Sequence, residues 1–330
     1  METGEVEAPT AALSDDVLGW IFDMLSDCRH LSRCRGVCRR FCRVASLPER
    51  WLQFRITAFG GEGFRRLMAA RHVLAGASGL RGDNISVEDF TEVIRAMPLL
   101  KSVQVPRFMS GKLDAKELPS ALESLCWFAS DLPAADALSP RFASLRKITC
   151  PISSNAELKD LLFALSKAEM PLEAVDLYCG VFGYGAPPGP DTPAVSGAVS
   201  GNLRKLLIRG ASEHILKPFR HCTSLESLML EFCLPPFVEV LALAAACPRL
   251  HTLRVLPRFI DEDEEIEEGS EVQPLASLTT LHAACTWPDS VLAAVLSSKC
   301  TPKLAYLSDL EEMGPLSAAM FAGRTSIARF

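Results

Sequence analysis

Three thiols come closest to a metal-binding pattern in this sequence. Cys34, Cys38 and Cys42 lie four residues apart after His30, and together they offer the soft ligands that zinc prefers. Along one continuous helix, however, those turns spread the thiols over about 12 Å, too far for a single ion. All three also fall on the apolar side of the helix expected there, so the spacing favours core packing. We therefore expect no metal and no other cofactor.

Catalytic motifs are equally absent from the sequence. The glycines of 181–200 have the wrong spacing for a phosphate loop, no Lys-Ser/Thr follows, and Pro187 and Pro188 remove backbone donors. The Gly and Pro content of that segment instead predicts a mobile loop. The six histidines occur in no ligand spacing, and the chain has no G-x-S-x-G elbow, Walker loop or G-x-G-x-x-G after a predicted strand. No catalytic residue is predicted, and the chain is not expected to be an enzyme.

Two charge runs indicate binding surfaces or solvated faces. Residues 29–55 hold eight arginines against one acid, Glu49, and a basic helix of this kind is one route to nucleic-acid binding. The chain as a whole carries a charge of −6, which argues against a surface built for nucleic acid. Residues 261–268 carry seven acids in eight positions, most simply a solvated, self-repelling loop; metal binding and docking of a basic partner remain alternatives.

Length and composition describe an ordinary globular chain. The 330 residues are 48% hydrophobic and 22% charged, which excludes wholesale disorder and fits about two domains. No apolar run approaches the ~20 residues that span a bilayer. The acidic residues 1–12, a predicted disordered leader, lack the features of a signal peptide, so the 12 cysteines are expected to be reduced in the cytoplasm or nucleus.

A repeated L-x-x-L-x-L pattern, with conservative replacements, organises residues 97–310. Its copies start 22 to 31 residues apart, and insertions at 181–200 and 260–273 lengthen individual steps. The nine starting residues are Leu100, Leu122, Leu145, Leu172, Leu203, Leu225, Leu250, Leu278 and Leu304. The last two apolar positions of each copy lie on one side of a strand. Helical spacing over 87–97, 156–168, 237–246 and 289–298 predicts helices between strands, hence an α/β solenoid in which each unit is buried only by its neighbours.

The repeats resemble leucine-rich repeats. In Cys222-Thr-Ser-Leu225 and Cys247-Pro-Arg-Leu250 a cysteine precedes the first leucine by three residues, and Cys300 precedes Leu304 by four. A thiol at this place is similar to the cysteine-containing repeats of F-box proteins. The resemblance implies a curved parallel sheet with helices on its convex side, preceded at 52–96 by linker helices and a first irregular repeat and followed at 311–330 by a C-terminal cap or tail.

The alternation of side chains along each strand predicts which residues form the ligand-binding surface of these repeats. The residue between the last two pattern positions of each copy should point onto the concave face; these are Gln104, Cys126, Thr149, Asp176, Leu207, Met229, Arg254, His282 and Ser308. Residues two positions earlier add Lys147, Ala174, Lys205 and Thr252. The row mixes charge and apolar groups, which suggests a protein or peptide ligand rather than a polyanion.

Residues 13–51 form a separate helical segment. At 100° per residue, the helix expected over 15–25 spreads its apolar side chains over about 200°, twice the stripe that a helix on a domain surface needs. Ser14 is its expected N-cap. A second helix over 31–45 has an apolar side and an arginine-lined side. A segment of about 40 residues usually needs outside help to fold, so it should dock on the repeats or on another protein.

This segment resembles an F-box from end to end, with Ser14 in place of the usual proline and Cys28-Arg29 in the polar turn. The matching residues are Leu13-Ser-Asp-Asp-Val-Leu-Gly-Trp-Ile-Phe-Asp-Met-Leu25, Leu31, Val37-Cys38-Arg39-Arg40-Phe41, Ala45 and Trp51. The resemblance implies binding to a Skp-type adaptor and, through it, to the cullin and RING subunits of a ubiquitin ligase. The residues expected to contact the adaptor or to build the fold that presents the contact are Leu13, Leu18, Ile21, Phe22, Leu25, Leu31, Val37, Cys38 and Phe41.

The sequence therefore predicts an F-box/leucine-rich-repeat protein that recognises substrates for an SCF-type ubiquitin ligase. Its partners would be the adaptor complex and a protein substrate, with no membrane. The alternative is an interaction scaffold whose repeats bind a partner while the F-box recruits no ligase.

Overall fold

The computed structural model describes residues 14–23, 33–45, 47, 55–106, 113–127, 140–152, 154–179, 193–210, 215–233, 237–257, 273–283, 295–297, 299–308 and 328–329. Acidic residues 261–268, most of the helix expected over 289–298 and most of the tail lie outside this part of the chain. The chain divides into two compact units, 1–122 and 123–330.

The first unit begins with the N-terminal helices. Helix α1 spans Asp15–Asp23 and α3 spans Arg39–Ala45. Ser14 caps α1 as expected, since its Oγ accepts a hydrogen bond from the Val17 amide at 3.2 Å.

The continuous helix predicted over 31–45 is wrong. Residues 33–35 are helical, residues 36 and 37 form a turn, and α3 starts at Arg39. Gly36, a poor helix residue, occupies the break, and its amide donates to the Arg33 carbonyl at 2.9 Å. At the other side of the break, the Phe41 amide donates to Cys38 Sγ at 3.5 Å. Cys38 therefore accepts a hydrogen bond at the start of α3 and does not belong to the apolar side of a continuous helix.

Three parallel strands in chain order complete the first unit, with short helices between them. The elements are β1 (Arg55–Phe59), α4 (Glu62–Ala69), α5 (Arg71–Gly76), β2 (Gly79–Asp83), α6 (Val87–Arg95), β3 (Ser102–Val105) and the 3-10 turn η3 (Ala115–Glu117). Strands β1 and β2 precede the first copy of the pattern, in the region predicted to hold linker helices and one irregular repeat. Their inward positions include Ala58 and Gly82, so the leucine pattern does not mark them.

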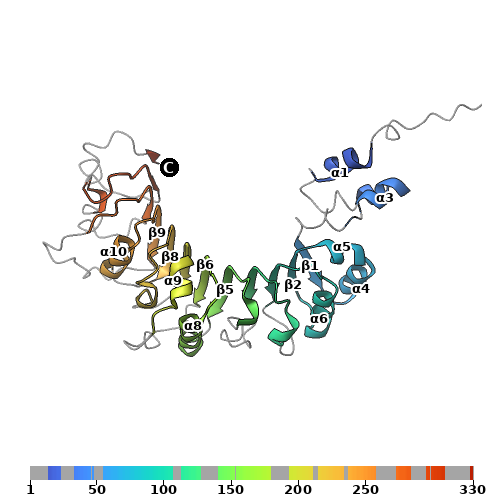
Figure 1. The fold of residues 1–330 in the computed structure, drawn as a ribbon, viewed down its shortest axis with the longest axis horizontal. Helices are drawn as coiled ribbons and strands as arrows, with labels where there is room; N and C mark the ends of the chain where they lie inside the picture. The colour runs from blue at the N-terminus through green and yellow to red at the C-terminus, as the bar shows by residue number, and fades with distance from the viewer. Residues whose placement is uncertain are drawn as a thin grey trace, which may run out of the picture. The chain divides into compact units, whose positions relative to one another are not determined.

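The second unit is a longer row of parallel strands, again in chain order (Figure 1). Its strands are β4 (Ser124–Trp127), β5 (Lys147–Ile152), β6 (Ala174–Cys179), β7 (Lys205–Arg209), β8 (Ser227–Cys233), β9 (Thr252–Pro257), β10 (Thr280–Ala283), β11 (Tyr306–Ser308) and β12 (Ala328–Arg329). Its helices are α8 (Asn155–Lys167), α9 (Gly197–Asn202) and α10 (Phe237–Ala246), and its 3-10 turns are η4 (Pro140–Phe142) and η5 (Lys217–Phe219). The α/β solenoid of parallel strands is thus confirmed.

The helices follow their local sequence signals. Helices α6, α8 and α10 match the predicted stretches within a residue or two, and Ser86 and Ser154 cap α6 and α8 through their hydroxyl oxygens. The prediction that all of 181–200 is a loop is wrong at its end, because α9 starts at Gly197. There the Val199 amide donates to Ser196 Oγ at 3.2 Å, so a serine cap starts this helix as well.

The apolar core follows the repeat pattern. The first leucine of every copy is buried, from Leu100 to Leu304, and so are the described side chains at the two later positions. The thiols of Cys222, Cys247 and Cys300 are also buried. Cys247 Sγ donates to the Cys222 carbonyl at 3.3 Å, and Cys300 Sγ donates to the Gln273 carbonyl at 3.6 Å. The thiols of Cys247 and Cys300 therefore each link their own repeat to the preceding repeat by a hydrogen bond.

A shared carbonyl fixes the register of each new strand. The Glu123 carbonyl accepts the amides of both Arg146 and Lys147, at 2.8 and 3.0 Å. The same two-amide arrangement recurs at the carbonyls of Ser78, Arg146, Glu173, Arg204, Glu226, His251 and Thr279, each receiving two consecutive amides from the next repeat. Successive strands therefore start in phase whatever the length of the chain between them.

Gly82 shows how closely β2 is packed. A Cβ at this position would lie 2.6 Å from Cδ of Pro106 and 2.9 Å from Cε2 of Phe90. Glycine is therefore required by space at an inward position that other repeats fill with a larger apolar side chain.

We expect Gly82→Ala to destabilise the protein by about 1–3 kcal/mol, because the buried ring atoms around it must move. Gly197→Ala is the matched control, since nothing lies within 4 Å of its added Cβ and alanine favours a helix. Urea unfolding followed by circular dichroism measures both. Equal stability of the two variants would contradict the tight packing of β2.

Candidate functional site

A small apolar core joins α1 and α3. Leu18 and Phe22 of α1 are buried against Val44 and Ala45 of α3. The rings of Phe22 and Phe41 meet edge to face, with centroids 5.4 Å apart. Val73 of α5 packs against the same cluster, so the N-terminal pair is anchored on the helices that follow it.

An acidic residue at the start of α1 holds two arginines of α3. Arg40 Nε donates to Asp15 Oδ1 at 2.7 Å, and an Nη of Arg43 donates to Oδ2 at 2.5 Å. The hydrogen bond from Arg40, with the bond and charge of Arg43, lowers the pKa of the Asp15 carboxyl. Part of the arginine-lined side of the segment is thus paired within the segment itself.

Helix α1 and the turn before α3 leave apolar side chains exposed to solvent. Val17 and Ile21, one helical turn apart on α1, are 42% and 38% exposed, and Val37 in the turn before α3 is 66% exposed. Cys38 is exposed beside Val37. We call Val17, Ile21, Val37 and Cys38 the apolar face of the N-terminal pair.

The predicted adaptor-contact residues therefore separate into two groups. Ile21, Val37 and Cys38 lie on the apolar face, whereas Leu18, Phe22 and Phe41 build the core beneath it. The remaining three, Leu13, Leu25 and Leu31, lie outside the described residues. Val17, which was not among the predicted contact residues, also lies on the apolar face, one helical turn from Ile21.

The three thiols of this segment have different surroundings. Cys34 and Cys42 are half-buried, but Cys38 is exposed, so its predicted core packing is wrong. The break at Gly36 turns Cys38 out of the apolar stripe that a continuous helix would have made. Among the described residues, no group of three or more His, Cys, Asp or Glu side chains is placed to hold a metal ion.

The second candidate surface is a face of the strands in the second unit. Helices α8 and α10 lie on one side of the strand row (Figure 1), and the repeat leucines are buried toward that side. We call the opposite side the open face. Strand pairing places the predicted ligand-binding residues of this unit in one row, each opposite the next: Cys126, Thr149, Asp176, Leu207, Met229, Arg254, His282 and Ser308.

Members of this row differ in how much they project. Thr149 is buried, and its hydroxyl donates to Asp176 Oδ2 at 3.2 Å. The other members with described side chains are half-buried, and for Ser308 the structure gives the strand position alone. The predicted Gln104 lies in the first unit, on β3, opposite Arg81 of β2.

Ion pairs concentrate on the open face of β5–β9. Lys147 Nζ lies 2.8 Å from Asp176 Oδ2. Further along, Glu231 pairs with Arg209 and has its Oε1 3.6 Å from Arg254 Nε. Arg209 and Glu231 were not among the predicted residues, because the strand alternation was applied only within the repeat pattern. Each lies two residues beyond the predicted position on its strand.

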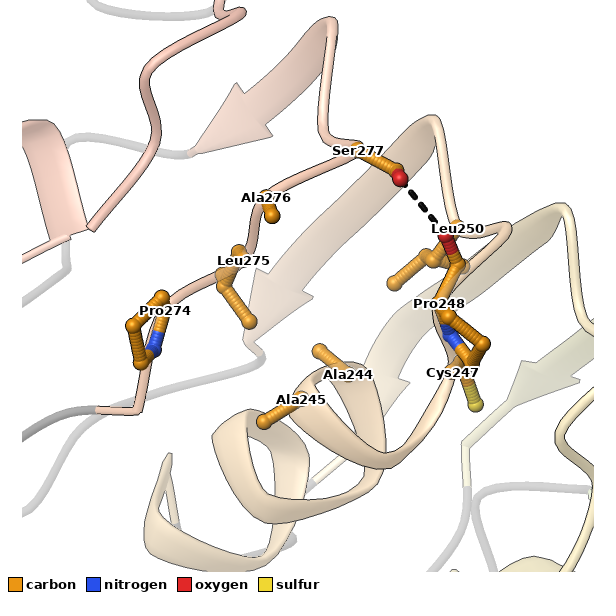
Figure 2. A pocket seen from close by; sticks show the side chains of 9 residues that line it. All are labelled: Ala244, Ala245, Cys247, Pro248, Leu250, Pro274, Leu275, Ala276 and Ser277. Carbon is orange, nitrogen blue, oxygen red and sulfur yellow. Dashed lines mark hydrogen bonds between the residues drawn. The ribbon is translucent and has the colours of Figure 1, made fainter. Parts of the chain in front are cut away.

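The second unit also has a shallow hollow beside α10 (Figure 2). Ala244, Ala245 and Cys247 line one side, Pro274 and Leu275 the other, and Ser277 Oγ donates to the Pro248 carbonyl at 2.5 Å across its edge. Its volume of about 180 Å³ is below the ~300 Å³ typical of small-molecule sites. Burial raises the pKa of Cys247 to about 11, so the thiol is not a nucleophile at neutral pH.

The chain is similar in fold to several solved structures, all at low sequence identity. No protein-family model and no curated protein matches the chain. Among solved structures, an internalin from Listeria monocytogenes is 13% identical over 79% of this chain and 69% of its own, with a TM-score of 0.47. TLR13 in complex with ssRNA13 is 16% identical over 71% of this chain and 32% of its own, with a TM-score of 0.44. Rad7, in its yeast complex with Elc1, is 12% identical over 96% of this chain and 92% of its own, with a TM-score of 0.34.

The class of fold follows from the structure itself. In-register parallel strands, one for each copy of L-x-x-L-x-L, with the pattern residues buried under intervening helices, make the described chain a leucine-rich-repeat solenoid. Within its described residues, no helix has the length and apolar character needed to cross a membrane.

The cysteines should differ sharply in reactivity. Burial raises the pKa of Cys222 to about 12 and that of Cys247 to about 11, from an ordinary value of 9.0, whereas Cys38 is exposed. Because the thiolate is the reactive form, iodoacetamide at pH 8 should label Cys38 well before Cys222 or Cys247 in the native protein, as read by peptide mass spectrometry.

The raised pKa values of Cys222 and Cys247 also predict how the stability of the folded protein changes with pH. Above pH 9.0 an unfolded chain releases these two thiol protons while the folded chain retains them, so stability should fall as the pH rises from 9.0 towards 11–12. Labelling of Cys222 at pH 8 at the rate of Cys38, with the protein still folded, would contradict the burial described here.

Proposed function

We propose that this chain is the substrate-recognition subunit of an SCF-type ubiquitin ligase. In this proposal residues 13–51 act as an F-box that binds a Skp-type adaptor, and the repeats bind the protein to be modified. Ubiquitin transfer belongs to other subunits of such a ligase, so this chain supplies no catalytic residue.

The observation that carries the proposal is the apolar face of the N-terminal pair. Val17, Ile21 and Val37 leave apolar surface in water while Leu18 and Phe22 fix the helix beneath them. Exposed apolar side chains on two adjoining elements can together form a protein interface. The F-box resemblance gives this interface its partner, because the same segment carries the motif.

The charge around this face supports a specific kind of partner surface. Arg33, Arg39 and Arg43 are exposed on the same segment. An adaptor that covers the apolar face would meet these cations at the rim, where complementary acidic groups speed association more than they add affinity.

The repeats supply the other half of the proposed function. Their open face presents polar, charged and apolar side chains from successive strands in one plane, which suits a protein or peptide ligand. In this proposal the adaptor and the substrate bind different parts of the chain, one in each unit.

We expect Ile21→Asp combined with Val37→Asp to abolish co-purification with a co-expressed Skp-type adaptor. Two carboxylates in an apolar interface lose their hydration without a partner, which should raise the Kd at least about tenfold. Both side chains are exposed, so the melting temperature should hardly change. Isothermal titration calorimetry gives the affinity, and differential scanning fluorimetry the stability.

Val238→Asp is the matched control, because Val238 is a similarly exposed valine, on α10. It should bind the adaptor like the natural sequence. In addition, bound adaptor should protect Cys38 from iodoacetamide. A folded natural chain that ignores the adaptor would overturn the ligase role and favour the scaffold alternative.

A further inference from the structure

A compact arginine–glutamate site lies on the open face across β6–β9. On these four consecutive strands the residues that pair directly are Tyr178, Arg209, Glu231 and Leu256. Arg254 lies two residues before Leu256 on β9. All belong to the second unit. The proposed function uses the open face only in general, so the chemistry that this particular site would recognise is a separate question.

One carboxylate at the site is shared by two arginines. Glu231 contacts Arg209 Nε through Oε2 and lies 3.6 Å from Arg254 Nε through Oε1. The Glu231 side chain is 9% exposed, whereas those of Arg209 and Arg254 are 41% and 36% exposed. The Glu231 carboxylate is therefore mostly buried, and the two guanidinium groups are more exposed to solvent.

Arg209 is held in position by two contacts before any ligand binds. The guanidinium of Arg209 lies over the ring of Tyr178, 4.9 Å from its centroid, while its Nε is paired with Glu231. A guanidinium that is stacked on one side and paired on another loses little conformational freedom when it binds a second carboxylate. The site is thus preorganised for an anion.

Strand β8, which carries Glu231, also carries an aromatic residue in a strained backbone conformation. Phe232 has a φ of +56°, in the left-handed region that bulky residues avoid, at a register shift between Glu231 and Cys233 in β8. Its side chain is 54% exposed, so burial of the ring does not compensate for the strain. Phe232 directly follows Glu231 in the chain. Backbone strain of this kind gathers at ligand-binding positions, so we take the exposed ring as a contact residue of the site.

The charge of the surrounding face favours an acidic ligand. On the described open face of β5–β9 the basic side chains are Lys147, Lys205, Arg209 and Arg254, against two acids, Asp176 and Glu231. Asp176 is mostly covered, like Glu231, with 13% of its side chain exposed. This face is net positive in a chain whose formal charge is −6.

We infer that this site binds an acidic segment of a partner protein, an inference that rests on the proposed role of the repeats in binding proteins. An Asp or Glu carboxylate of the segment pairs with Arg209 and Arg254, and an apolar side chain next to it packs on Phe232. A nucleic acid fits the site less well, because Asp176 and Glu231 interrupt the cations that a phosphate backbone would follow.

The test selects ligands without assuming one. A phage library of random peptides is selected on the immobilised full-length protein, and the Kd values of selected synthetic peptides are measured by fluorescence anisotropy. Selected peptides should share an Asp or Glu next to an apolar residue, and replacing that acid by its amide should raise the Kd about tenfold.

Variants locate the binding. Arg254→Gln and Arg209→Gln should each raise the Kd about tenfold. Phe232→Gly should also weaken binding, but it should leave the melting temperature unchanged or higher, because glycine adopts a positive φ without strain. This variant separates lost contact from lost folding if either arginine variant is unstable. Arg95→Gln and Phe163→Ala are matched controls, an exposed ion-paired arginine and an exposed phenylalanine elsewhere, and should bind normally.

Several outcomes would overturn the inference. These are a library that yields no binder, selected peptides without a shared acid, a Kd unaffected by Phe232→Gly and Arg254→Gln, or preferential binding of a single-stranded RNA oligonucleotide at the same residues. Adaptor binding through Ile21 and Val37 is measured separately. Its failure with intact peptide binding would remove the ligase role and leave the peptide site standing.

Discussion

The two-amide carbonyl at the start of each strand is the constraint on which the rest of the structure depends. At most strand pairs of the described chain one carbonyl, such as that of Arg146, receives two consecutive amides of the next repeat, so the next strand starts in a fixed register. A shift by one residue would exchange the leucines for the residues of the open face. The apolar core and the ion pairs of Asp176 and Glu231 therefore both depend on this one backbone contact.

The fixed phase explains why so much of the second unit was predictable from sequence. Leucines at set positions mark each strand, alternation assigns the opposite face, and parallel register aligns residues such as Asp176, Leu207 and Met229 without any further information. Strands β1 and β2 lack that mark, because Ala58 and Gly82 occupy inward positions where the pattern requires large apolar residues. Gly82 is fixed by the closeness of Pro106, a contact between repeats that no periodicity within one repeat reveals.

In the N-terminal segment two helical stretches were predictable from sequence, but the break before α3 was not. Helical periodicity over 31–45 placed Val37 and Cys38 on a buried side, and one break at Gly36 turned both into solvent. Periodicity assumes a continuous helix, so it fails wherever a glycine ends one. The arginines were equally ambiguous in sequence; the pairing of Arg40 and Arg43 with Asp15 depends on how α3 lies against α1. The strained Phe232 had no sequence signal, since a bulge adds a residue without changing the pattern before it.

The register of each repeat is set by contacts with the repeat before it. Positions along the solenoid are therefore spaced in units of one strand. Loss or duplication of one whole repeat would move everything beyond it by a single strand spacing, about 4.8 Å, and would leave the alternation of the two faces intact. Distances between binding groups on such a surface change in steps of that size. The chemistry of a site within one or two repeats and its separation from a second site can therefore vary independently of each other.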